Sequence, residues 1–449
     1  MKISKIAVHG LFSRFNHEIA LDPCERITII FGPNGFGKTT ILRLLDVLFN
    51  RSLRSLGRMP FEKLHVTFED ESILTVVRNS DKSSPIFSYD TPTKTEDSFE
   101  PEPLSRAQDV TFPLSAIEDF VPRLERIATR EWRNIHTNEV LDLDNVIATY
   151  ADLLPFDVEM PEERYPPWLK KIRTSLSVRL IDTERLTDFS TDQRSIRNRS
   201  PYPRVRSSYP RVTAERTVRR YSELLESKVQ QTLTEYATLS QSLDRSFPAR
   251  LVEELGRESP SIDQLIEDLE QVEKRRSEIV EAGFLPQEDE SLRFPVFNAV
   301  DESTRSVLAV YAQDATKKLN AFENLYARAN AFVRIANSRL LYKKVSVSPK
   351  GFKVSNADGS ELELEMLSSG EQHEIVLLFD LLFGTQKNSL IMVDEPELSL
   401  HVAWQREMLS DLQEMAELSD FRALLATHSP QIIGDRWDLT IELHGPDKI

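Results

Sequence analysis

The most constraining feature of the chain is a glycine-rich turn, Gly32-Pro33-Asn34-Gly35-Phe36-Gly37-Lys38-Thr39, which fits the pattern G-x-x-x-x-G-K-[ST]. It lies between the apolar run Ile27–Phe31 and the apolar-periodic segment Thr40–Leu45, so the order is strand, turn, helix. Glycines lack a Cβ, so successive N–H groups can curl around phosphates while the new helix points its positive end at them. Lys38 would add charge for the β- and γ-phosphates and Thr39 a hydroxyl for Mg²⁺. We therefore predict a nucleotide site; the alternative is an ordinary βα turn.

Composition narrows the class of protein. The 449 residues are 40% hydrophobic and 29% charged, which is typical of a soluble globular chain. The net charge of -16 argues against general coating of nucleic acid, which needs Lys and Arg, although a local basic patch remains possible. The single cysteine, Cys24, excludes an internal disulfide, and we expect it to be a small buried thiol. We find neither a signal peptide nor an apolar run near the ~20 residues of a membrane span, and expect a cytoplasmic protein.

Periodicity predicts further elements in the first half of the chain. Alternating apolar residues indicate strands around Ile6 and Ile19. Between them, Phe12, Arg14 and Phe15 are candidates for contact with adenine or ribose, and a core role for the two phenylalanines is an equal alternative. The pattern then predicts a β-hairpin over residues 63–78 and a loop over 81–103. Helical segments are expected over 113–155 and 162–173, followed by a buried strand over 175–181 that rejoins the nucleotide sheet.

A basic segment follows at Arg194–Arg220. It holds nine arginines and one acid, Glu215, and two tyrosines, Tyr202 and Tyr209, lie among the arginines. Such a mixture suits the grip of nucleic acid or an acidic partner, and a solvated loop is the alternative.

A helical arm is predicted next. Apolar residues recur at steps of three and four over residues 218–243 and, after Phe247-Pro248, over residues 262–279, which favours a short antiparallel helical hairpin. A third helix is expected over roughly 302–338, and strand signals return over residues 344–364.

A second group of motifs lies near the C-terminus. Leu367-Ser368-Ser369-Gly370-Glu371-Gln372 opens a helix and, taken alone, is a serine N-cap with a glutamate in the first turn. The continuous apolar run Leu390–Val393 then predicts a buried parallel strand that ends in Asp394-Glu395-Pro396-Glu397. Adjacent carboxylates at a strand end point to opposite sides, so we assign Asp394 to the metal, Glu395 to the general base and Glu397 to a structural role.

A further buried strand, residues 421–427, delivers His428 at its carboxyl end. Ligands bind at that end in open α/β sheets, so a histidine there can sense or stabilise a γ-phosphate.

Phosphate loop, LSSGEQ, DEPE and ATHSP, in that order and with a helical insertion between the first two, resemble the ABC-type ATPases of the SMC, RecF and OLD group. The resemblance covers residues 1–60 and 340–445 and implies an α/β fold: an ABC-type P-loop ATPase head, with a mixed sheet and flanking helices, that carries an inserted α-helical hairpin arm. It also implies Mg²⁺-dependent hydrolysis of ATP and a homo-oligomer, in which the signature helix of one copy caps the nucleotide of another. The expected segments are 1–187 (phosphate-loop lobe), 188–300 (arginine-rich loop and helical insertion) and 301–449 (connecting helix and second lobe). The residues that the resemblance implies are Glu395 and His428 for catalysis, Thr39 and Asp394 for Mg²⁺, and Gly32, Asn34, Gly35, Gly37, Lys38, Thr39, Thr40, Ser368 and Gly370 for ATP.

The chain departs from the wider ABC pattern in two places. The signature has Ser369 where LSGGQ transporters carry glycine and Glu371 where they carry glutamine, a form similar to the SMC and OLD branches. No glutamine follows the strand that ends at Ile181, so the Q-loop role is left unassigned.

The expected partners also follow from resemblance. OLD-type proteins continue into a Toprim nuclease domain, which this sequence lacks after residue 443, so no nuclease activity of its own is expected. Compact ATPases of this layout resemble the ATPase subunits of bacterial anti-phage systems, above all PARIS and more loosely Septu. That implies a sensor or scaffold that controls a separate Toprim-type effector nuclease, with an acidic phage trigger protein or DNA at Arg194–Arg220. The alternatives are a RecF-like or SMC-like repair ATPase that clamps duplex DNA and, with a poorer fit, an ABC transporter subunit.

Overall fold

The structure is a computed structural model that divides into two compact units, residues 1–212 with 385–449 and residues 213–384. The predicted segment 301–449 is therefore shared between the two units. The residues described are 1–51, 53–78, 84–96, 98–101, 114, 117–118, 121, 124–135, 140–143, 146, 165–182, 214–255, 260–286, 301–398 and 405–445.

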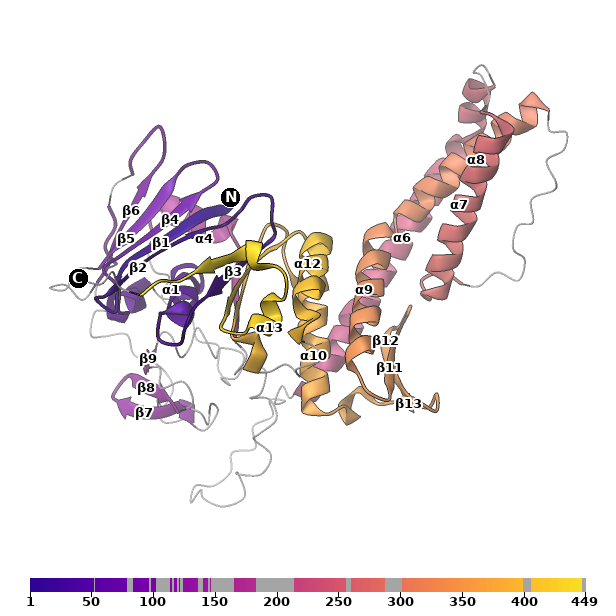
Figure 1. Cartoon of the computed structure of the whole chain (residues 1–449). Helices are drawn as coiled ribbons and strands as arrows, with labels where there is room; N and C mark the ends of the chain where they lie inside the picture. Colours follow the sequence, from indigo (N-terminus) through magenta and orange to yellow (C-terminus); the bar gives the residue numbers. More distant parts are fainter. Residues whose placement is uncertain are drawn as a thin grey trace. The chain divides into compact units, whose positions relative to one another are not determined.

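The first unit is built around a five-stranded parallel sheet (Figure 1). Its order is β10, β14, β15, β3 and β16, with bounds Val178–Asp182, Leu390–Asp394, Arg422–Thr427, Ile27–Phe31 and Thr440–Glu442. The register pairs Asp394 with Ala426 and Thr427 with Phe31, so β14, β15 and β3 end side by side. This confirms the predicted strands and the return of β10 to the nucleotide sheet.

A second sheet of five antiparallel strands belongs to the same unit. Its order is β2, β1, β4, β5 and β6, with bounds Phe15–Ala20, Ile3–Leu11, Lys63–Phe68, Ile73–Val77 and Ile86–Asp90. The first helix, α1 (Lys38–Asn50), shares one core cluster with both sheets, for example through Leu45, Val66 and Met392. The predicted hairpin is confirmed as β4 and β5, whereas β6 corrects the prediction of a loop over residues 81–103.

The prediction of helix over residues 113–155 holds at the described residues 117, 118, 143 and 146 and is wrong between them. There the structure has a three-stranded antiparallel sheet of β7 (Leu124–Ala128), β8 (Glu131–Asn134) and β9 (Val140–Asp142). The indole of Trp132 is fully buried in a small core of its own with Leu124 and Leu141. Long-range strand pairing decides the structure here, and three-to-four spacing over a short stretch did not reveal it. The helix predicted over 162–173 is present as α4 (Pro167–Ser175).

Cys24 is also corrected, because it is exposed. It lies in the short connection between β2 and β3, where its N–H donates to Asp22 Oδ1 at 2.7 Å.

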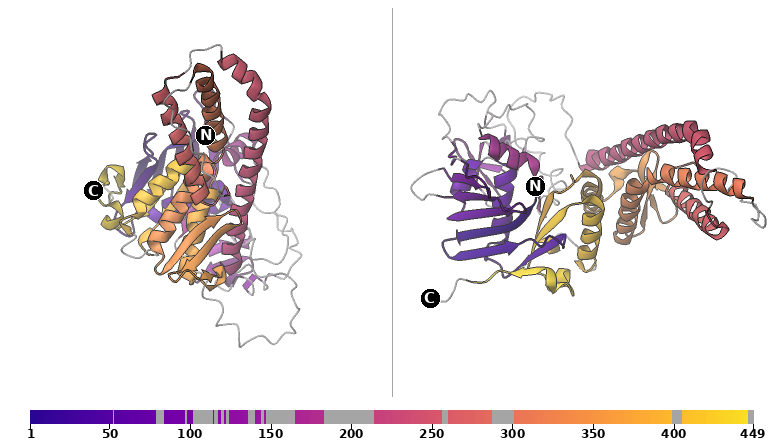
Figure 2. Two further views of the ribbon diagram at one scale, coloured as in Figure 1. Left: turned by 90° about the vertical axis from the view of Figure 1, so that its right-hand side faces the viewer. Right: turned by 90° about the horizontal axis from the view of Figure 1, so that it is seen from above.

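The second unit is mainly helical (Figures 1 and 2). It contains α6 (Ala214–Glu254), α7 (Ile262–Glu281), α8 (Glu302–Asn320) and α9 (Glu323–Arg339). The helix α8 packs against both α6 and α7, so the predicted two-helix hairpin is replaced by a group in which α8 joins the other two. The predicted third helix is divided into α8 and α9.

The predicted break at Pro248 is absent, since α6 continues through the proline. Arg250 supports this turn of the helix: its Nη2 donates to Leu243 O at 2.6 Å and to Asp314 Oδ2 on α8 at 2.7 Å. Tertiary contacts therefore offset the backbone hydrogen bond that proline removes.

A small sheet and the signature helix complete the second unit. The strands β11 (Lys343–Ser348), β12 (Gly351–Asn356) and β13 (Glu361–Leu362) form an antiparallel sheet, as the strand signals predicted. The helix α10 (Ser369–Phe379) follows, and the first unit resumes with β14 and α12 (Met408–Ser419). The expected α/β head with an inserted helical segment is confirmed. Among the described residues, no helix combines the length and apolarity that crossing a bilayer requires.

Candidate functional site

The phosphate loop connects β3 to α1 in the first unit. Gly35 and Gly37 adopt φ angles of 88° and 92°, which lie in the left-handed region that glycine accepts readily. The ammonium group of Lys38 donates to Gly32 O at 2.6 Å and to Pro33 O at 3.3 Å, and the residue is only 4% exposed. The loop therefore closes around its own lysine, and backbone N–H groups and the helix N-terminus are available at the same place. Asn34 is exposed at the tip of the loop.

The candidate metal position joins the first turn of α1 to the end of β14. Thr39 donates its hydroxyl hydrogen to Asp394 Oδ1 at 3.0 Å. A hydroxyl and a carboxylate are oxygen ligands of the kind that Mg²⁺ takes, and Mg²⁺ at triphosphates uses one or two protein groups beside phosphate oxygens and water. The two residues fit this ion, although the described residues contain no group of three or more His, Cys, Asp or Glu side chains arranged for a metal. Thr40 follows on the same turn and is half-buried.

The backbone turns sharply after Asp394. Glu395 has a φ of 43°, unusual for a residue with a side chain, and its N–H donates to Ala426 O at 2.8 Å. The alternation of side chains that holds within a strand therefore does not carry through Glu395. Strain of this kind persists where surrounding contacts hold it and is common at functional sites.

His428 and Glu397 form a contact that the sequence did not reveal. The Nδ1 atom of His428 lies 3.0 Å from Glu397 Oε1 and 3.7 Å from Glu395 Oε1. The same Glu397 oxygen accepts hydrogen bonds from Thr427 Oγ1 at 2.7 Å and from the N–H of His428 at 3.0 Å. The Glu397 side chain is 8% exposed, and its Oε2 has no hydrogen-bond partner within the described part of the chain. Glu397 therefore holds the imidazole by one nitrogen and leaves Nε2 for another ligand.

The phosphate loop is also supported from β2. His17 Nε2 lies 2.9 Å from Phe36 O, and Phe15 stacks on His17 and packs against Phe36. Burial lowers the pKa of His17; the Phe36 carbonyl opposes this shift and His444 adds to it. Phe15 is partly buried against the main core, whereas Phe12 remains 42% exposed.

The signature residues Ser368 and Gly370 belong to the second unit. Ser368 caps α10 in a complete capping box with Glu371, as the local interpretation of the motif predicted. Lys343 on β11 donates to both carboxylate oxygens of Glu371, at 2.8 and 2.6 Å, which the sequence did not indicate. Burial raises the pKa of Glu371, but the hydrogen bonds from Lys343 and Ser368 outweigh burial and bring it below its ordinary value.

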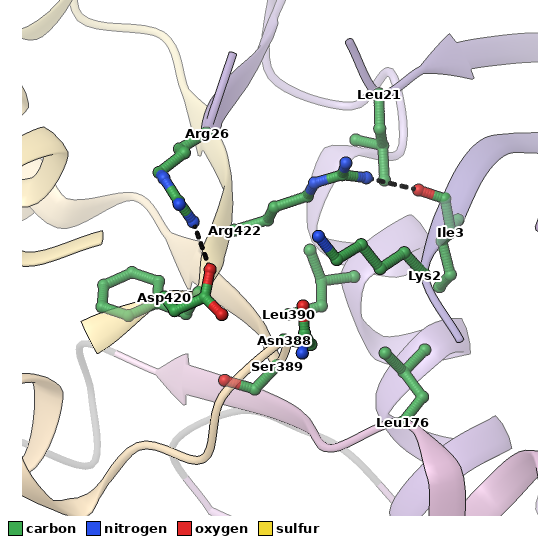
Figure 3. Close-up of a pocket in the computed structure, with 11 residues that line it drawn as sticks. Lys2, Ile3, Leu21, Arg26, Leu176, Asn388, Ser389, Leu390, Asp420 and Arg422 are labelled. Atoms are coloured by element: carbon green, nitrogen blue, oxygen red, sulfur yellow. Dashed lines mark hydrogen bonds and ion pairs between the residues drawn. The ribbon is translucent and has the colours of Figure 1, made fainter. Parts of the chain in front are cut away.

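One pocket of the first unit lies away from this chemistry. Figure 3 shows Arg26 and Asp420 paired at 2.9 Å and Arg422 donating to Ile3 O at 3.2 Å. These residues are at the amino ends of β3 and β15, whereas the phosphate loop follows the carboxyl end of β3. The pocket is therefore separate from the candidate site.

The structure thus gathers the predicted loop residues, Asp394, Glu395 and His428 at the carboxyl ends of three adjacent parallel strands. This arrangement is that of a P-loop nucleotide-hydrolysing domain. The model of the AAA ATPase domain matches residues 1–97 and 205–433, more than half of the chain, so the protein belongs to that family. Membership implies binding and hydrolysis of ATP.

Two further comparisons are more limited. The chain is 41% identical over 61 residues to the DNA replication and repair protein RecF of Stutzerimonas stutzeri (strain A1501), a stretch that covers 13% of this chain and about a sixth (16%) of the relative. The SMC head domain from Thermotoga maritima is 10% identical with a TM-score of 0.35, over 98% of this chain and 94% of that one. The Smc head domain with an extended coiled coil bound to the C-terminal domain of ScpA, from Pyrococcus furiosus, is 12% identical with a TM-score of 0.32, over 97% and 91%. These TM-scores are too low to support an assignment of the fold, which is based on the strand order described above.

The prediction that the chain is an ATPase is confirmed by its membership of the AAA ATPase domain family. The finer resemblance to anti-phage ATPases stays a prediction. Most of the arginine-rich segment, residues 194–213, and the Q-loop position after Asp182 lie outside the described residues.

Proposed function

We propose that this ATPase is a nucleotide-driven switch in which two copies clasp ATP, each giving its phosphate loop to one nucleotide and its signature helix to the other. The observation that supports this best is Gly370. It lies within α10, its φ is not in the left-handed region, and no described atom lies within 4 Å of the position that a Cβ would occupy. Glycine in a helix loses more conformational freedom on folding than alanine does, also in the first turn where Gly370 lies. The described residues give no reason for this glycine, whereas close approach of a ligand does.

The roles of the site residues follow from their positions. Lys38 binds the β- and γ-phosphates, and Thr39 and Asp394 hold Mg²⁺, which neutralises phosphate charge when bound. Glu395 accepts a proton from the attacking water. His428, oriented through Nδ1, directs Nε2 toward the terminal phosphate.

The test separates nucleotide binding from the ATP-dependent association of two copies. Lys38→Ala should abolish nucleotide binding. Gly370→Ala should bind ATP normally in separated copies and melt no lower than the parent, since alanine favours helix, but should lose ATP-dependent association in analytical ultracentrifugation. Gly370→Ala that associates as well as the parent would contradict the proposal.

For the cellular role we infer a sensor and scaffold subunit of a bacterial anti-phage system, which controls a separate Toprim-type effector nuclease. The resemblance of the motif layout to such ATPases supports this, as does the basic segment Arg194–Arg220, which suits an acidic trigger protein or DNA. Co-expression with neighbouring genes and pull-down in the presence and absence of ATP tests it. Absence of a stable protein partner in both conditions would count against it.

The second candidate is a RecF-like ATPase that clamps duplex DNA, and the 41% identity to RecF over 61 residues favours it. It predicts ATP-dependent binding to long duplexes that weakens steeply with salt. A gel shift at low salt that finds no such binding would remove this candidate.

A further inference from the structure

The cap of the signature helix α10 includes an ion pair, between Lys343 and Glu371, that a capping box does not require. In the capping box, Glu371 Oε2 accepts from the N–H and the hydroxyl of Ser368, each at 2.8 Å. A serine and a glutamate complete such a box by themselves. Here Lys343, from the neighbouring sheet, also donates to both Glu371 oxygens, and each of these two side chains is 21% exposed. The lysine is therefore not needed to complete the cap.

The glutamate also occupies the donors that an incoming phosphate needs. Hydroxyl and N–H groups at a helix N-terminus are natural ligands of anions. In the structure, the Ser368 hydroxyl donates to Glu371, whose carboxylate is charged at neutral pH. A triphosphate that approached Ser368 would meet this negative charge, and like charges in an interface oppose association strongly.

We propose that Lys343 is a positioning residue of the signature motif: it neutralises Glu371 and remains a donor to its carboxylate when Ser368 turns its hydroxyl from Glu371 to the terminal phosphate held by a second copy. This role rests on the proposed two-copy site. Lys343 acts through Glu371 and contacts no reacting atom.

The experiment removes the charge and keeps the apolar stem. Lys343→Met, made in the slowly hydrolysing Glu395→Gln chain, should reduce ATP-dependent association by roughly tenfold or more at low salt. The deficit should shrink as salt rises, because the repulsion is electrostatic. Binding of a fluorescent ATP analogue to separated copies should not change, because Lys38 and its loop belong to the other unit. If Lys343→Met does not fold, Lys343→Gln gives the same comparison.

Two controls separate this role from a structural one. Adding Glu371→Gln to Lys343→Met should restore association, since glutamine keeps the capping hydrogen bonds without the charge. Lys353→Met should have no effect: Lys353 pairs with Glu361 at 3.0 Å between strands of the same small sheet, on more exposed side chains. Unchanged association in Lys343→Met, or a defect that Glu371→Gln leaves in place, would overturn the proposal. Failure of the Glu395→Gln parent itself to associate with ATP would instead overturn the two-copy site, and the role of Lys343 with it.

Discussion

Replacing either of two glycines of the phosphate loop by alanine should have unequal effects. At Gly37, with a φ of 92°, alanine must adopt a left-handed conformation that costs about 1–2 kcal/mol. Its Cβ would also lie 2.3 Å from Leu11 Cδ2, and Leu11 is fully buried, which adds about 1–3 kcal/mol of overpacking. At Gly35 the φ is 88°, and no described atom lies within 4 Å of the new Cβ, so only the backbone cost remains. Gly37→Ala should therefore be worse by about 1–3 kcal/mol.

The assay is amide hydrogen exchange of the α1 peptides, because local opening is measured where the loop joins the helix. Protection in Gly37→Ala should be lower than in Gly35→Ala by roughly fivefold to 150-fold. In a double-mutant cycle, Leu11→Ala should relieve part of the Gly37→Ala cost by removing the Cδ2 atom. Equal protection in the two single variants, or no coupling to Leu11, would refute the packing argument.

Three further predictions concern the site. Glu395→Gln should bind ATP and release phosphate at least about a hundredfold more slowly in single-turnover assays, and a normal rate would reject Glu395 as the base. Glu397→Gln should lower kcat and leave KM nearly unchanged, because Glu397 acts on the reaction through His428. A variant that melts at a lower temperature but keeps its full kcat would show that Glu397 serves only packing. Burial lowers the pKa of His17 below 6.5, its ordinary value, in the folded protein. The neutral imidazole therefore contributes fully to the free energy of unfolding above pH 6.5, and this contribution is lost as the pH falls through the folded pKa. Thermal melts should show this loss in the parent and not in His17→Gln, and parallel pH profiles would contradict it.

The nucleotide half of the site was predictable because it is local. Strand, glycine turn and helix follow one another over Ile27–Leu45, and the assignment of Thr39 and Asp394 to one metal ion needs only that β3 and β14 end at the same edge. The partners Glu397 for His428 and Lys343 for Glu371 were not predictable in the same way. Each depends on a side-chain direction set by tertiary structure, and neither a single glutamate after a strand nor a single lysine within one carries such a signal.

The wrong predictions of secondary structure have the same origin. The segment around Trp132 has spacing that suits a helix, yet burial of the indole against Leu124 and Leu141 selects a sheet. Pro248 would end an isolated helix, yet the contacts of Arg250 to Asp314 and Leu243 hold the turn. In both cases contacts between distant residues override a correct local preference.

The glycines themselves indicate which contacts this chain leaves to another molecule. Gly37 is required by its φ and by Leu11, and Gly35 by its φ alone, so both are explained within the first unit. Gly370 has neither reason, although a helix would be more stable with alanine there. A residue that weakens its own helix without relieving any internal strain is best explained by what approaches from outside. The hydroxyl of Ser368, two residues before Gly370, already donates to Glu371, so an incoming phosphate must compete with this carboxylate. The contact from Lys343 to the same Glu371 oxygen lowers the cost of that exchange.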